Sequence, residues 1–395
     1  MKRTLIEKDA YLKKTFKKYY YGSVTRIKAP SRLSEREIGY LTFSPEKMVR
    51  HLAFKDEGEL RALILHEAPK AVYYSSAYYD DPSAPINARI WKGADLIFDI
   101  DLDHLPQEDD LMTSFFVCHK CKSVFENLES KNCPYCNSQS VEEVKIATEK
   151  GLECCKKEII KLTEILEKDF GLLKDHFCIY FSGKRGYHLT VEGTKYEMAG
   201  QPFRIELSDY LTLNGFRLNK FLNGDIPPEQ QVYQFPSPWE KGWLGRFSRE
   251  YLKNTLGDSN VNYDEDTFRN MLLPILSKSK YEDILSSLES IKKRLSVKID
   301  VAVTTDIHRI FRMPDTLHGG TGFVKKKIEN IDEFSPLTHA IVLSDEPTKV
   351  HVFYSPKFEL KDNFYGPYKN EDLVLPEYAA TFLVAMGLAQ ALEVC

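Results

Sequence analysis

An apolar segment with carboxylates at alternate positions, Leu96–Asp103 (LIFDIDLD), constrains the fold of this chain most strongly. Side chains two residues apart in a strand share a face, so Asp99 and Asp101 are expected to point the same way while Phe98 and Ile100 turn to a core. Neighbouring carboxylates repel each other unless cations lie between them, and hard divalent ions such as Mg²⁺ prefer oxygen ligands. The segment predicts a metal-binding strand. A half-buried edge strand with a solvated acidic face is the alternative.

The length of 395 residues allows one large domain with insertions, or two to three smaller ones. A hydrophobic share of 43% and a charged share of 28% are ordinary for a globular chain with a sizeable core. No apolar run approaches the roughly 20 residues of a membrane span, and the first residues lack the apolar stretch of a signal peptide. We therefore expect a cytoplasmic protein.

The net charge of −4 excludes a polycation that holds nucleic acid through its global field, so any such contact must be local. Two basic patches are candidates. The first has Lys13, Lys14, Lys17 and Lys18 beside three tyrosines, followed by Arg26 and Lys28, and the second is the triplet Lys325–Lys327. Basic residues next to aromatic ones suit phosphate contact and base stacking. For the first patch, a helix with a solvated lysine face is an equal alternative.

Four of the eight cysteines form two Cys-x-x-Cys pairs, Cys118 with Cys121 and Cys133 with Cys136. Two such pairs separated by a short polar loop are the usual way to present four thiolates to Zn²⁺ in a tetrahedral site. Four thiolates leave no open coordination position, so this zinc is expected to be structural. His119 is a less favoured alternative ligand in place of a neighbouring sulfur.

The rest of the chain alternates strand-like and helical runs. Residues 104–140 are expected to be a zinc-stabilised insertion, Val141–Phe170 one long helix, and His176–Phe181 a strand. Asp209–Arg294 lacks clear strand runs and predicts a helical subdomain, after which Ser296–Val303 is expected to resume the α/β core as a strand.

A turn with two glycines, Ser182–His188 (SGKRGYH), follows the strand that ends at Phe181. The glycines allow the backbone to turn closely around a ligand, Lys184 and Arg185 bring positive charge, and Ser182 and His188 bring hydrogen-bond donors. Such a loop suits a triphosphate. An ordinary basic glycine turn between two strands is the alternative.

A third polar cluster runs from Asp300 through Arg309 and Arg312 to His318. It offers one more metal carboxylate and a group of phosphate-binding side chains. Because Arg309 and Arg312 are three residues apart, a helical turn would place them on one face. For Asp306, we favour capping of that turn over a role in metal binding.

In this order, the three clusters resemble the three motifs of the archaeo-eukaryotic primase catalytic (small) subunit. Further likeness to the archaeal branch comes from Arg50-His51, Tyr73–Ser75 and the Trp91–Asp95 segment that precedes the acidic strand. The resemblance extends over about residues 15–350, with less signal in the helical insertion and the C-terminal tail.

The resemblance implies a DNA primase, a DNA-directed RNA polymerase and nucleotidyltransferase that makes short RNA primers on single-stranded DNA from nucleoside triphosphates. Asp99, Asp101 and Asp300 would bind two catalytic divalent cations, Mg²⁺ or Mn²⁺, for two-metal-ion nucleotidyl transfer. The incoming triphosphate would be held by Ser182, Arg185, His188, Arg309, Arg312 and His318. Lys184 stands at a variable position of its motif and receives a subsidiary role, and because zinc ligands vary within the family the ligand set is less secure than the triad.

The implied fold is α/β, of the α+β kind: a primase-type catalytic core with mixed sheets flanked by helices, a zinc-binding insertion and a helical subdomain. Residues 1–208 and 295–395 would form the core, with one structural Zn²⁺ in the insertion at about 104–140, and residues 209–294 the helical subdomain. The resemblance also implies a primase large (regulatory) subunit as heterodimeric partner. The expected location is the cytoplasm, at the nucleoid during replication, with no membrane partner.

Two other classes compete with this interpretation. Phe98–Asp101 also looks like the opening motif of haloacid-dehalogenase-type phosphatases, but that family expects a Gly-Thr-like pair after the second Asp, whereas Leu102-Asp103 follows here. A zinc-containing module that only binds nucleic acid explains Cys118–Cys136 and leaves the three polar clusters without a purpose.

Overall fold

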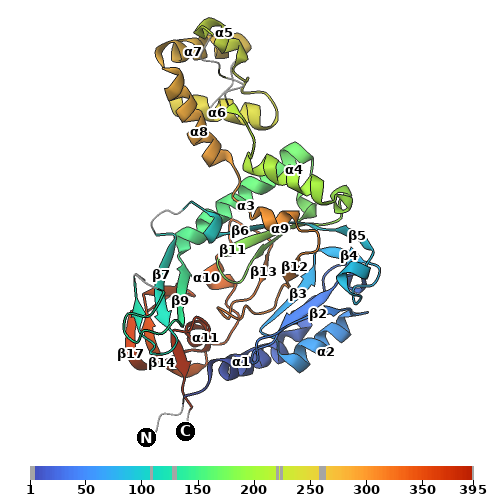
Figure 1. Cartoon of the computed structure of the whole chain (residues 1–395), viewed down its shortest axis with the longest axis vertical. Coiled ribbons are helices and arrows are strands. Elements are labelled where there is room, and N and C mark those ends of the chain that lie inside the picture. The colour runs from blue at the N-terminus through green and yellow to red at the C-terminus, as the bar shows by residue number, and fades with distance from the viewer. Residues whose placement is uncertain are drawn as a thin grey trace. The chain divides into compact units, whose positions relative to one another are not determined.

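The computed structural model describes residues 5–106, 110–126, 131–218, 222, 226–257 and 264–393. Contacts divide the chain into two compact units (Figure 1). The sheet unit comprises Met1–Ile159, His176–Pro202 and Asp300–Cys395, and the helical unit comprises Ile160–Asp175 and Phe203–Ile299. The domain limits expected from the sequence, 208/209 and 294/295, stay a prediction.

The acidic segment forms strand β6 (Leu96–Asp101), which lies at the edge of a four-stranded antiparallel sheet with order β13-β10-β11-β6. The other strands are β10 (Phe177–Phe181), β11 (Gly186–Val191) and β13 (Lys326–Ile328). Leu96, Phe98 and Ile100 are buried while Asp99 and Asp101 are half-buried, so the alternation expected from the sequence sets the faces of this strand.

A second four-stranded antiparallel sheet has the order β12-β3-β1-β2. Its strands are β1 (Ile38–Leu41), β2 (Met48–Leu52), β3 (Ala71–Ser75) and β12 (Ile310–Arg312). Helices α1 (Lys8–Ser23) and α2 (Glu57–Glu67) belong to the same part of the unit. Phe16 of α1 is fully buried and packs edge-on against Phe43, 5.3 Å between ring centroids. The two four-stranded sheets form the frame of the unit.

Smaller sheets complete the sheet unit. The cysteine-bearing insertion contains β7 (Met112–Cys118), β8 (Val124–Phe125) and β9 (Val141–Ala147), paired in the order β8-β7-β9. Towards the C-terminus, β14 (Pro347–Ser355) pairs with β17 (Tyr368–Pro376) and β18 (Ala389–Ala391). The remaining elements are β4 (Ala77–Tyr79), β5 (Trp91–Ala94), β15 (Phe358–Leu360), β16 (Asn363–Tyr365), α9 (Val301–Thr305), α10 (Pro336–His339) and α11 (Glu377–Ala385).

The helical unit contains α4 (Gln201–Thr212), whose first residues belong to the sheet unit, α5 (Pro228–Gln234), α6 (Gly242–Leu256), α7 (Glu265–Lys278) and α8 (Tyr281–Leu295). The C-terminal part of α3 (Glu149–Phe170) also lies in it. Arg246 of α6 donates to both carboxylate oxygens of Asp169, at 2.6 and 2.9 Å. Phe216 stacks on Phe247 with ring centroids 5.1 Å apart. These contacts tie α6 to α3 and to the segment after α4.

The expected α+β fold with several sheets, flanking helices and a cysteine-bearing insertion is confirmed, with three corrections. The pairings of the described sheets are antiparallel, so the sheets are not of mixed strand direction. The single helix expected over Val141–Phe170 is instead strand β9 followed by α3. Residues Val141–Ala147 pair with β7, and the side chains of Val144 and Ile146, two residues apart in the strand, are both buried. Ser296–Val303 forms no strand, because Asp300 caps a short helix there.

None of the helices in the described part of the chain is long and apolar enough to cross a membrane.

Candidate active site and zinc site

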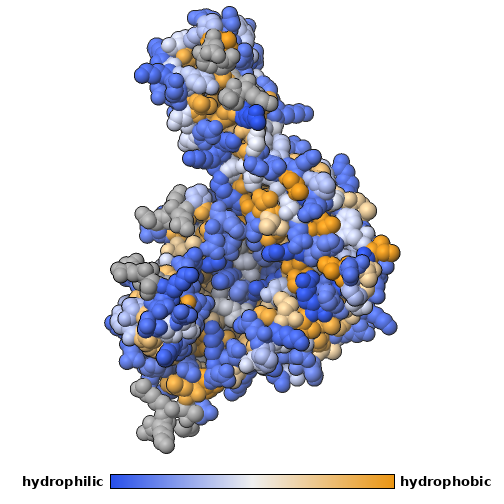
Figure 2. All heavy atoms as spheres, viewed as in Figure 1, coloured by the Kyte–Doolittle hydropathy of each residue, from blue (hydrophilic) through white to orange (hydrophobic). Residues whose placement is uncertain are grey.

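Side chains from the two four-stranded sheets and the segments that follow them line a cleft of about 210 Å³. The space-filling view shows the middle of this face hollowed, over the region of β11, β13 and α10 (Figure 2). The cleft is lined by Tyr73, Asp99, Asp101, Ser182, Lys184, His188, Val303, Arg309, Ile310, Phe311, Arg312 and His318. The three polar clusters of the sequence thus contribute to one cavity.

The acidic face of β6 is positioned by its pairing with β11, in which Asp99 lies opposite His188 and Asp101 opposite Gly186. His188 Nε2 lies 3.3 Å from Asp99 Oδ1. Burial acts to raise the pKa of Asp99, but the adjacent His188 outweighs it and lowers that pKa. Burial lowers the pKa of His188 although Asp99 opposes the shift. Asp99 is therefore an ionised carboxylate near neutral pH.

Gly186 makes the close approach of the two strands possible. A Cβ atom at this position would lie 2.3 Å from the carbonyl oxygen of Ile100 and 2.9 Å from the Cα of Asp101. The second glycine of the Ser182–His188 turn is thus required where β11 passes the carboxylate pair. Ser182 Oγ accepts hydrogen bonds from the N–H groups of Lys184 (3.3 Å) and Gly186 (3.2 Å), which closes the turn.

Asp300 lies beside the acidic strand but its side chain does not line the cleft. Its backbone N–H donates to the carbonyl of Asp99 at 2.9 Å. Its Oδ1 accepts from the N–H groups of Ala302 (2.9 Å) and Val303 (3.3 Å), so it is the N-cap of α9. His104 Nε2 is 3.9 Å from the second carboxylate oxygen, Oδ2. Asp300 is thus held next to Asp99 by its backbone while one of its oxygens caps a helix.

Asp101 is held by Arg185, whose Nε lies 3.1 Å from Asp101 Oδ1. The same guanidinium also binds Asp103, and Asp101 accepts a hydrogen bond from the Asp103 N–H at 3.1 Å. Burial raises the pKa of Asp101, and the charges of Asp99 and Asp103 act in the same direction against Arg185. Arg185 itself does not line the cleft.

The three carboxylates form an all-oxygen donor set of the kind that Mg²⁺ and Mn²⁺ prefer. Within the described residues, the ligand atoms of Asp99, Asp101 and Asp300 are not all within 4.8 Å of one another, unlike those of the four cysteines described below. Asp99 is paired with His188 and Asp101 with Arg185, while Asp300 caps α9. The donor chemistry fits divalent cations.

The opposite side of the cleft is basic. Arg312 Nη1 and His188 Nδ1 are buried and have no hydrogen-bond partner among the described residues. His318 Nδ1 accepts from the N–H of Gly320 at 2.9 Å, which leaves its Nε2 as the N–H donor. Burial, with Arg312 and Lys184 nearby, lowers the pKa of His318 well below its usual value. The unpaired buried Nη1 of Arg312 and the Nε2–H of His318 are donors that suit a bound anion such as a phosphate group. In neutral His188, the Nε2–H faces Asp99 and Nδ1 is an acceptor.

The helical turn expected for Arg309 and Arg312 is wrong. Ile310–Arg312 is strand β12, which pairs with β3 so that Arg312 lies opposite Tyr73. Arg309 precedes the strand, and both arginines line the cleft although they do not share a helix face. Asp306 accepts from the N–H of His308 at 2.9 Å, which is the capping role expected for it in a turn rather than a helix.

Two further residues belong to this site, although the sequence analysis assigned neither of them to it. Tyr73 lines the cleft, with the Arg312 guanidinium 5.8 Å from its ring. Lys325 is fully buried, and its Nζ donates to the carbonyl of Arg312 at 2.8 Å. Burial, with Arg312 nearby, lowers the pKa of Lys325 to about 7. The sequence analysis treated the Lys325–Lys327 triplet as a basic patch for local nucleic-acid contact, because the burial of Lys325 depends on tertiary packing.

The first basic patch is the solvated face of α1. Lys13, Lys14, Lys17 and Lys18 are exposed, while Leu12 and Phe16 on the other face are buried. Lys18 pairs with Glu346 and Glu377, the latter at 3.2 Å. The solvated-face alternative therefore describes this patch.

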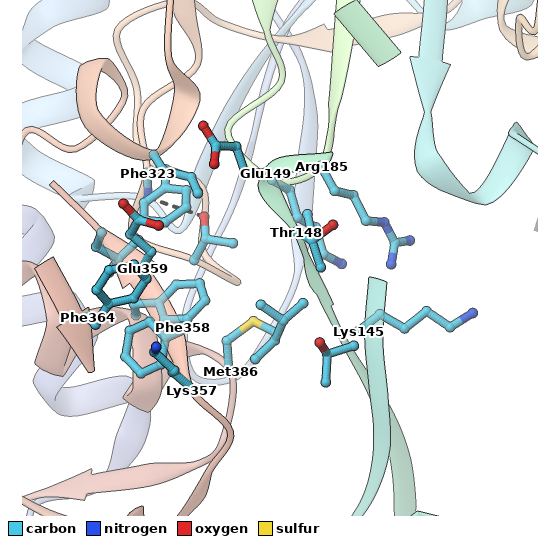
Figure 3. A pocket seen from close by; sticks show the side chains of 18 residues that line it. Lys145, Thr148, Glu149, Arg185, Phe323, Lys357, Phe358, Glu359, Phe364 and Met386 are labelled. Carbon is cyan, nitrogen blue, oxygen red and sulfur yellow. Dashed lines mark hydrogen bonds between the residues drawn. The ribbon is translucent and has the colours of Figure 1, made fainter. Parts of the chain in front are cut away.

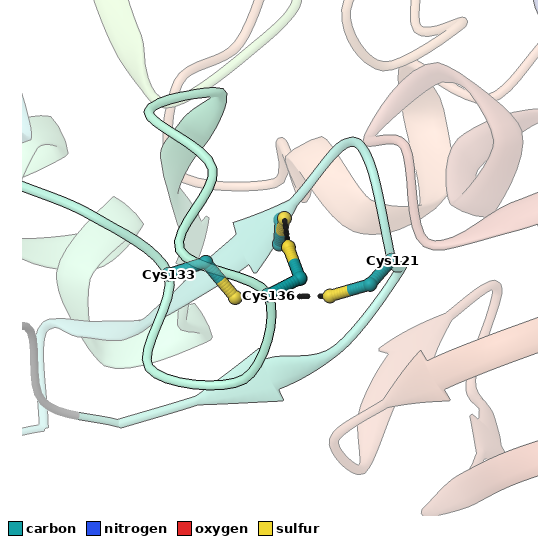
Figure 4. Close-up of side chains that lie close together, drawn as sticks. Cys121, Cys133 and Cys136 are labelled. Atoms are coloured by element: carbon teal, nitrogen blue, oxygen red, sulfur yellow. Dashed lines mark hydrogen bonds between the residues drawn. The ribbon is translucent and has the colours of Figure 1, made fainter.

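The four paired cysteines meet at one end of the β8-β7-β9 sheet (Figure 4). Their Sγ atoms all lie within 4.8 Å of one another, with Cys118 and Cys136 3.5 Å apart and Cys121 and Cys133 3.7 Å apart. Each Cys-x-x-Cys pair closes a tight turn, as the N–H of Lys122 donates to the carbonyl of Cys118 at 2.8 Å. His119 is instead 2.8 Å from Glu142. The four sulfurs fit a tetrahedral Zn²⁺. Residues 107–109 and 127–130 of the predicted insertion lie outside the described part.

Comparison with known proteins adds independent evidence. A family model described as DNA primase small subunit matches residues 141–329. A protein named DNA primase small subunit PriS from Nitrosopumilus maritimus is 35% identical over 96% of this chain and 97% of its own length. A relative of the same name from Cenarchaeum symbiosum is 32% identical over 98% of this chain and 99% of its own length. One from Archaeoglobus fulgidus is also 32% identical, over 95% of this chain and 97% of its own length.

Among solved structures, the polymerase domain of Mycobacterium tuberculosis ligase D in complex with DNA matches 81% of this chain and 83% of that chain. The sequence identity is 12% and the TM-score is 0.37, too low to support an inference about this chain.

Proposed function

This chain belongs to the DNA primase small subunit family, and on that basis we propose how its cleft makes primers. It is a primase catalytic subunit, a nucleotidyltransferase that synthesises RNA primers. Neither the phosphatase nor the zinc-module alternative finds support. The observation that carries the proposal is the convergence of Asp99 and Asp101, Ser182 and His188, and Arg309 and Arg312 on one cleft.

Asp99, Asp101 and Asp300 are proposed to hold two divalent cations, Mg²⁺ or Mn²⁺. Support comes from the shared face of Asp99 and Asp101, the backbone hydrogen bond that fixes Asp300 beside Asp99, and the ionised state of Asp99. When bound, such cations lower the pKa of an attacking 3′-hydroxyl and offset negative charge on a leaving pyrophosphate. Arg185 would keep its hydrogen bond to Asp101 and so orient that carboxylate.

The basic side of the cleft would bind the triphosphate of the incoming nucleotide. In the described part of the chain, Arg312 Nη1 and His188 Nδ1 have no hydrogen-bond partner, and Arg312 Nη1 and His318 Nε2–H are donors. Arg309 is exposed at the same cleft and Ser182 lies at its turn. These groups would hold the β- and γ-phosphates in line for attack. Arg185 would reach the triphosphate only by leaving its aspartates, so we assign it chiefly to positioning Asp101.

The reaction forms a bond between the 3′-oxygen of one nucleotide and the α-phosphorus of the next. The bond from that phosphorus to the bridging oxygen breaks, pyrophosphate leaves, and the proton of the 3′-hydroxyl passes to solvent. No side chain forms a covalent intermediate. His318 therefore serves as a neutral phosphate donor through Nε2–H, in agreement with its lowered pKa. His188, whose Nε2–H faces Asp99, donates from Nδ1 to a phosphate only as an imidazolium.

We further propose that single-stranded DNA is the template, that nucleoside triphosphates are the substrates, and that a primase large subunit assists initiation as a heterodimeric partner. Cys118, Cys121, Cys133 and Cys136 would bind one structural Zn²⁺. The protein would act in the cytoplasm, at the nucleoid during replication.

Synthesis of short oligonucleotides from nucleoside triphosphates on single-stranded DNA tests the proposal. The chain, with its large subunit if needed, should make such products with Mg²⁺ or Mn²⁺ and none after chelation. Asp99→Ala and Asp101→Ala should abolish synthesis, whereas Asp345→Ala, an exposed carboxylate paired with Lys361, should retain it. Full polymerising activity in both cleft variants would overturn the metal assignment.

A further inference from the structure

We propose that Thr321 is a positioning residue of the nucleotide site. Its buried hydroxyl joins the Ser182–His188 turn to the loop that carries His318, and so sets the separation of the two segments that hold the triphosphate. This role rests on the proposed primase function and adds to it a residue that touches no substrate. Thr321 is 3% exposed and lies behind the cleft rather than among the residues that line it.

The hydroxyl of Thr321 serves two backbone groups. It donates to the carbonyl oxygen of Gly183 at 2.6 Å, and because a carbonyl can only accept, the direction of this bond is fixed. Its oxygen accepts from the N–H of Phe323 at 3.2 Å. Figure 3, which shows a second cavity of about 290 Å³ that Thr321 and Phe323 both line, marks the bond to Phe323 by a dashed line. Loss of the hydroxyl would leave a buried acceptor and a buried donor unpaired.

The loop that carries His318 is tightly closed by its own backbone. The N–H of His318 donates to the carbonyl of Phe323 at 2.7 Å, and the carbonyl of His318 accepts from the N–H groups of Thr321 (3.1 Å) and Gly322 (2.8 Å). The His318 ring accepts from the N–H of Gly320 at 2.9 Å. Because ring and backbone are held together in this way, a displacement of Thr321 carries the Nε2–H of His318 with it.

The turn on the other side approaches His318 closely. Gly183 has a φ of +88°, and a Cβ atom there would lie 3.2 Å from the Cβ of His318. Ser182 and Lys184, the two neighbours of Gly183, line the cleft together with His318. The hydrogen bond from Thr321 to the Gly183 carbonyl therefore fixes the polar groups of the turn relative to the His318 donor.

A triphosphate is sensitive to this separation because its phosphates are proposed to contact both segments. The two segments are 138 residues apart in the chain where Thr321 meets Gly183, so tertiary contacts alone set their distance. Hydrogen bonds to phosphate oxygens weaken when donor and acceptor move apart by a few tenths of an ångström. A nucleoside monophosphate lacks the β- and γ-phosphates. A change in the separation should therefore weaken triphosphate binding more than monophosphate binding.

Equilibrium binding of a non-hydrolysable ATP analogue and of AMP to the full chain, each with Mg²⁺, measures this difference. Thr321→Val keeps the shape of the side chain and removes the hydroxyl. We expect the ratio of triphosphate to monophosphate affinity to fall about tenfold in this variant. Thr321→Ser restores the hydroxyl and should keep the ratio within about threefold of the wild type. An equal loss of affinity for both nucleotides in Thr321→Val, or an unchanged ratio, would overturn the positioning role.

Gly183→Ala disturbs the same contact from the other side and keeps the Thr321 hydroxyl. The new methyl group crowds His318, so the ratio should fall as it does in Thr321→Val. Gly193→Ala is the matched control, because Gly193 also has a positive φ, +71°, while a Cβ there meets nothing within 4 Å. The control should keep the wild-type ratio. Equal ratios in the two alanine variants would contradict the proposal even if Thr321→Val did not fold.

Primer extension separates failure of this role from failure of the proposed function. In Thr321→Val, the KM for the incoming nucleotide should rise about tenfold, and Thr321→Ser should restore it. A wild type that makes no primers while the binding ratio falls as predicted would contradict the proposed function alone. An active wild type whose binding ratio is unchanged in Thr321→Val and Gly183→Ala would contradict the positioning role alone.

Discussion

The backbone N–H of Asp300 donates a hydrogen bond of 2.9 Å to the backbone carbonyl of Asp99. This contact joins the end of the acidic strand to the first turn of α9, far apart in sequence. It sets the distance between two carboxylate side chains through the main chain, so the substitution of either side chain leaves the link in place. Each carboxylate can therefore be tested without dismantling the site.

Arg312→Lys is expected to weaken binding of the incoming nucleotide. Lysine keeps the charge but lacks the planar fork, and the buried Nη1 that we assign to a phosphate would be lost. The KM for the incoming nucleotide in primer extension should rise about tenfold, the equivalent of about 1.4 kcal/mol. Arg61→Lys, on the surface of α2 and paired with Glu57, is the control. An unchanged KM in Arg312→Lys would remove this residue from the nucleotide site.

Lys325→Met should abolish one component of the pH dependence of stability. The pKa of Lys325 is lowered to about 7 in the fold, so between this pH and its usual 10.5 the unfolded chain binds more protons than the folded one. The free energy of unfolding therefore rises with pH in this window, by up to about 1.4 kcal/mol per pH unit from this group.

Urea unfolding at pH 7 and pH 9 measures that component as the difference between wild type and variant. The wild type should gain about 2 kcal/mol more than Lys325→Met on going from pH 7 to pH 9. Lys168→Met, on an exposed position of α3, should behave as the wild type. Parallel pH dependence in wild type and Lys325→Met would mean that Lys325 titrates normally.

Gly186→Ala should destabilise the acidic sheet. The new Cβ would lie 2.3 Å from the Ile100 carbonyl, so β11 or β6 must move. Overpacking of this kind costs about 1–3 kcal/mol, which thermal unfolding can measure. Gly22→Ala, where a Cβ meets nothing within 4 Å, should be neutral or slightly stabilising. Equal melting temperatures for the two variants would show that the strands can adjust freely.

Zinc should be present at about one equivalent in the purified chain, and Cys133→Ser should lose it. Because Cys133 and Cys136 bring the 131–140 segment to the end of β7, the variant should also become more sensitive to proteolysis between β8 and β9. Cys154→Ser in α3 should retain the metal. Elemental analysis measures the metal content, and a metal-free wild-type protein would exclude the four-thiolate site.

The sequence was most informative where spacing alone determines geometry. The alternation around Asp99 and Asp101 and the two Cys-x-x-Cys pairs depend on local periodicity, and both appear in the structure as expected. Val141–Phe170 was misassigned because the short strand β9 precedes a long helix without a glycine or proline between them. Arg309 and Arg312 suggested a helical turn, but pairing of β12 with β3 overrides local spacing. The burial of Lys325 depends on packing between distant segments, which no local pattern reveals.

Primer extension by Asp300→Asn and Asp306→Asn tests the central claim most directly. Asparagine caps a helix about as well as aspartate, so α9 should persist in Asp300→Asn while the charge proposed to hold a divalent cation is lost. We predict that Asp300→Asn lowers the extension rate at least about 100-fold, and that Asp306→Asn, five residues past the start of the same helix, stays within about twofold. Wild-type extension by Asp300→Asn with an intact fold would contradict the account.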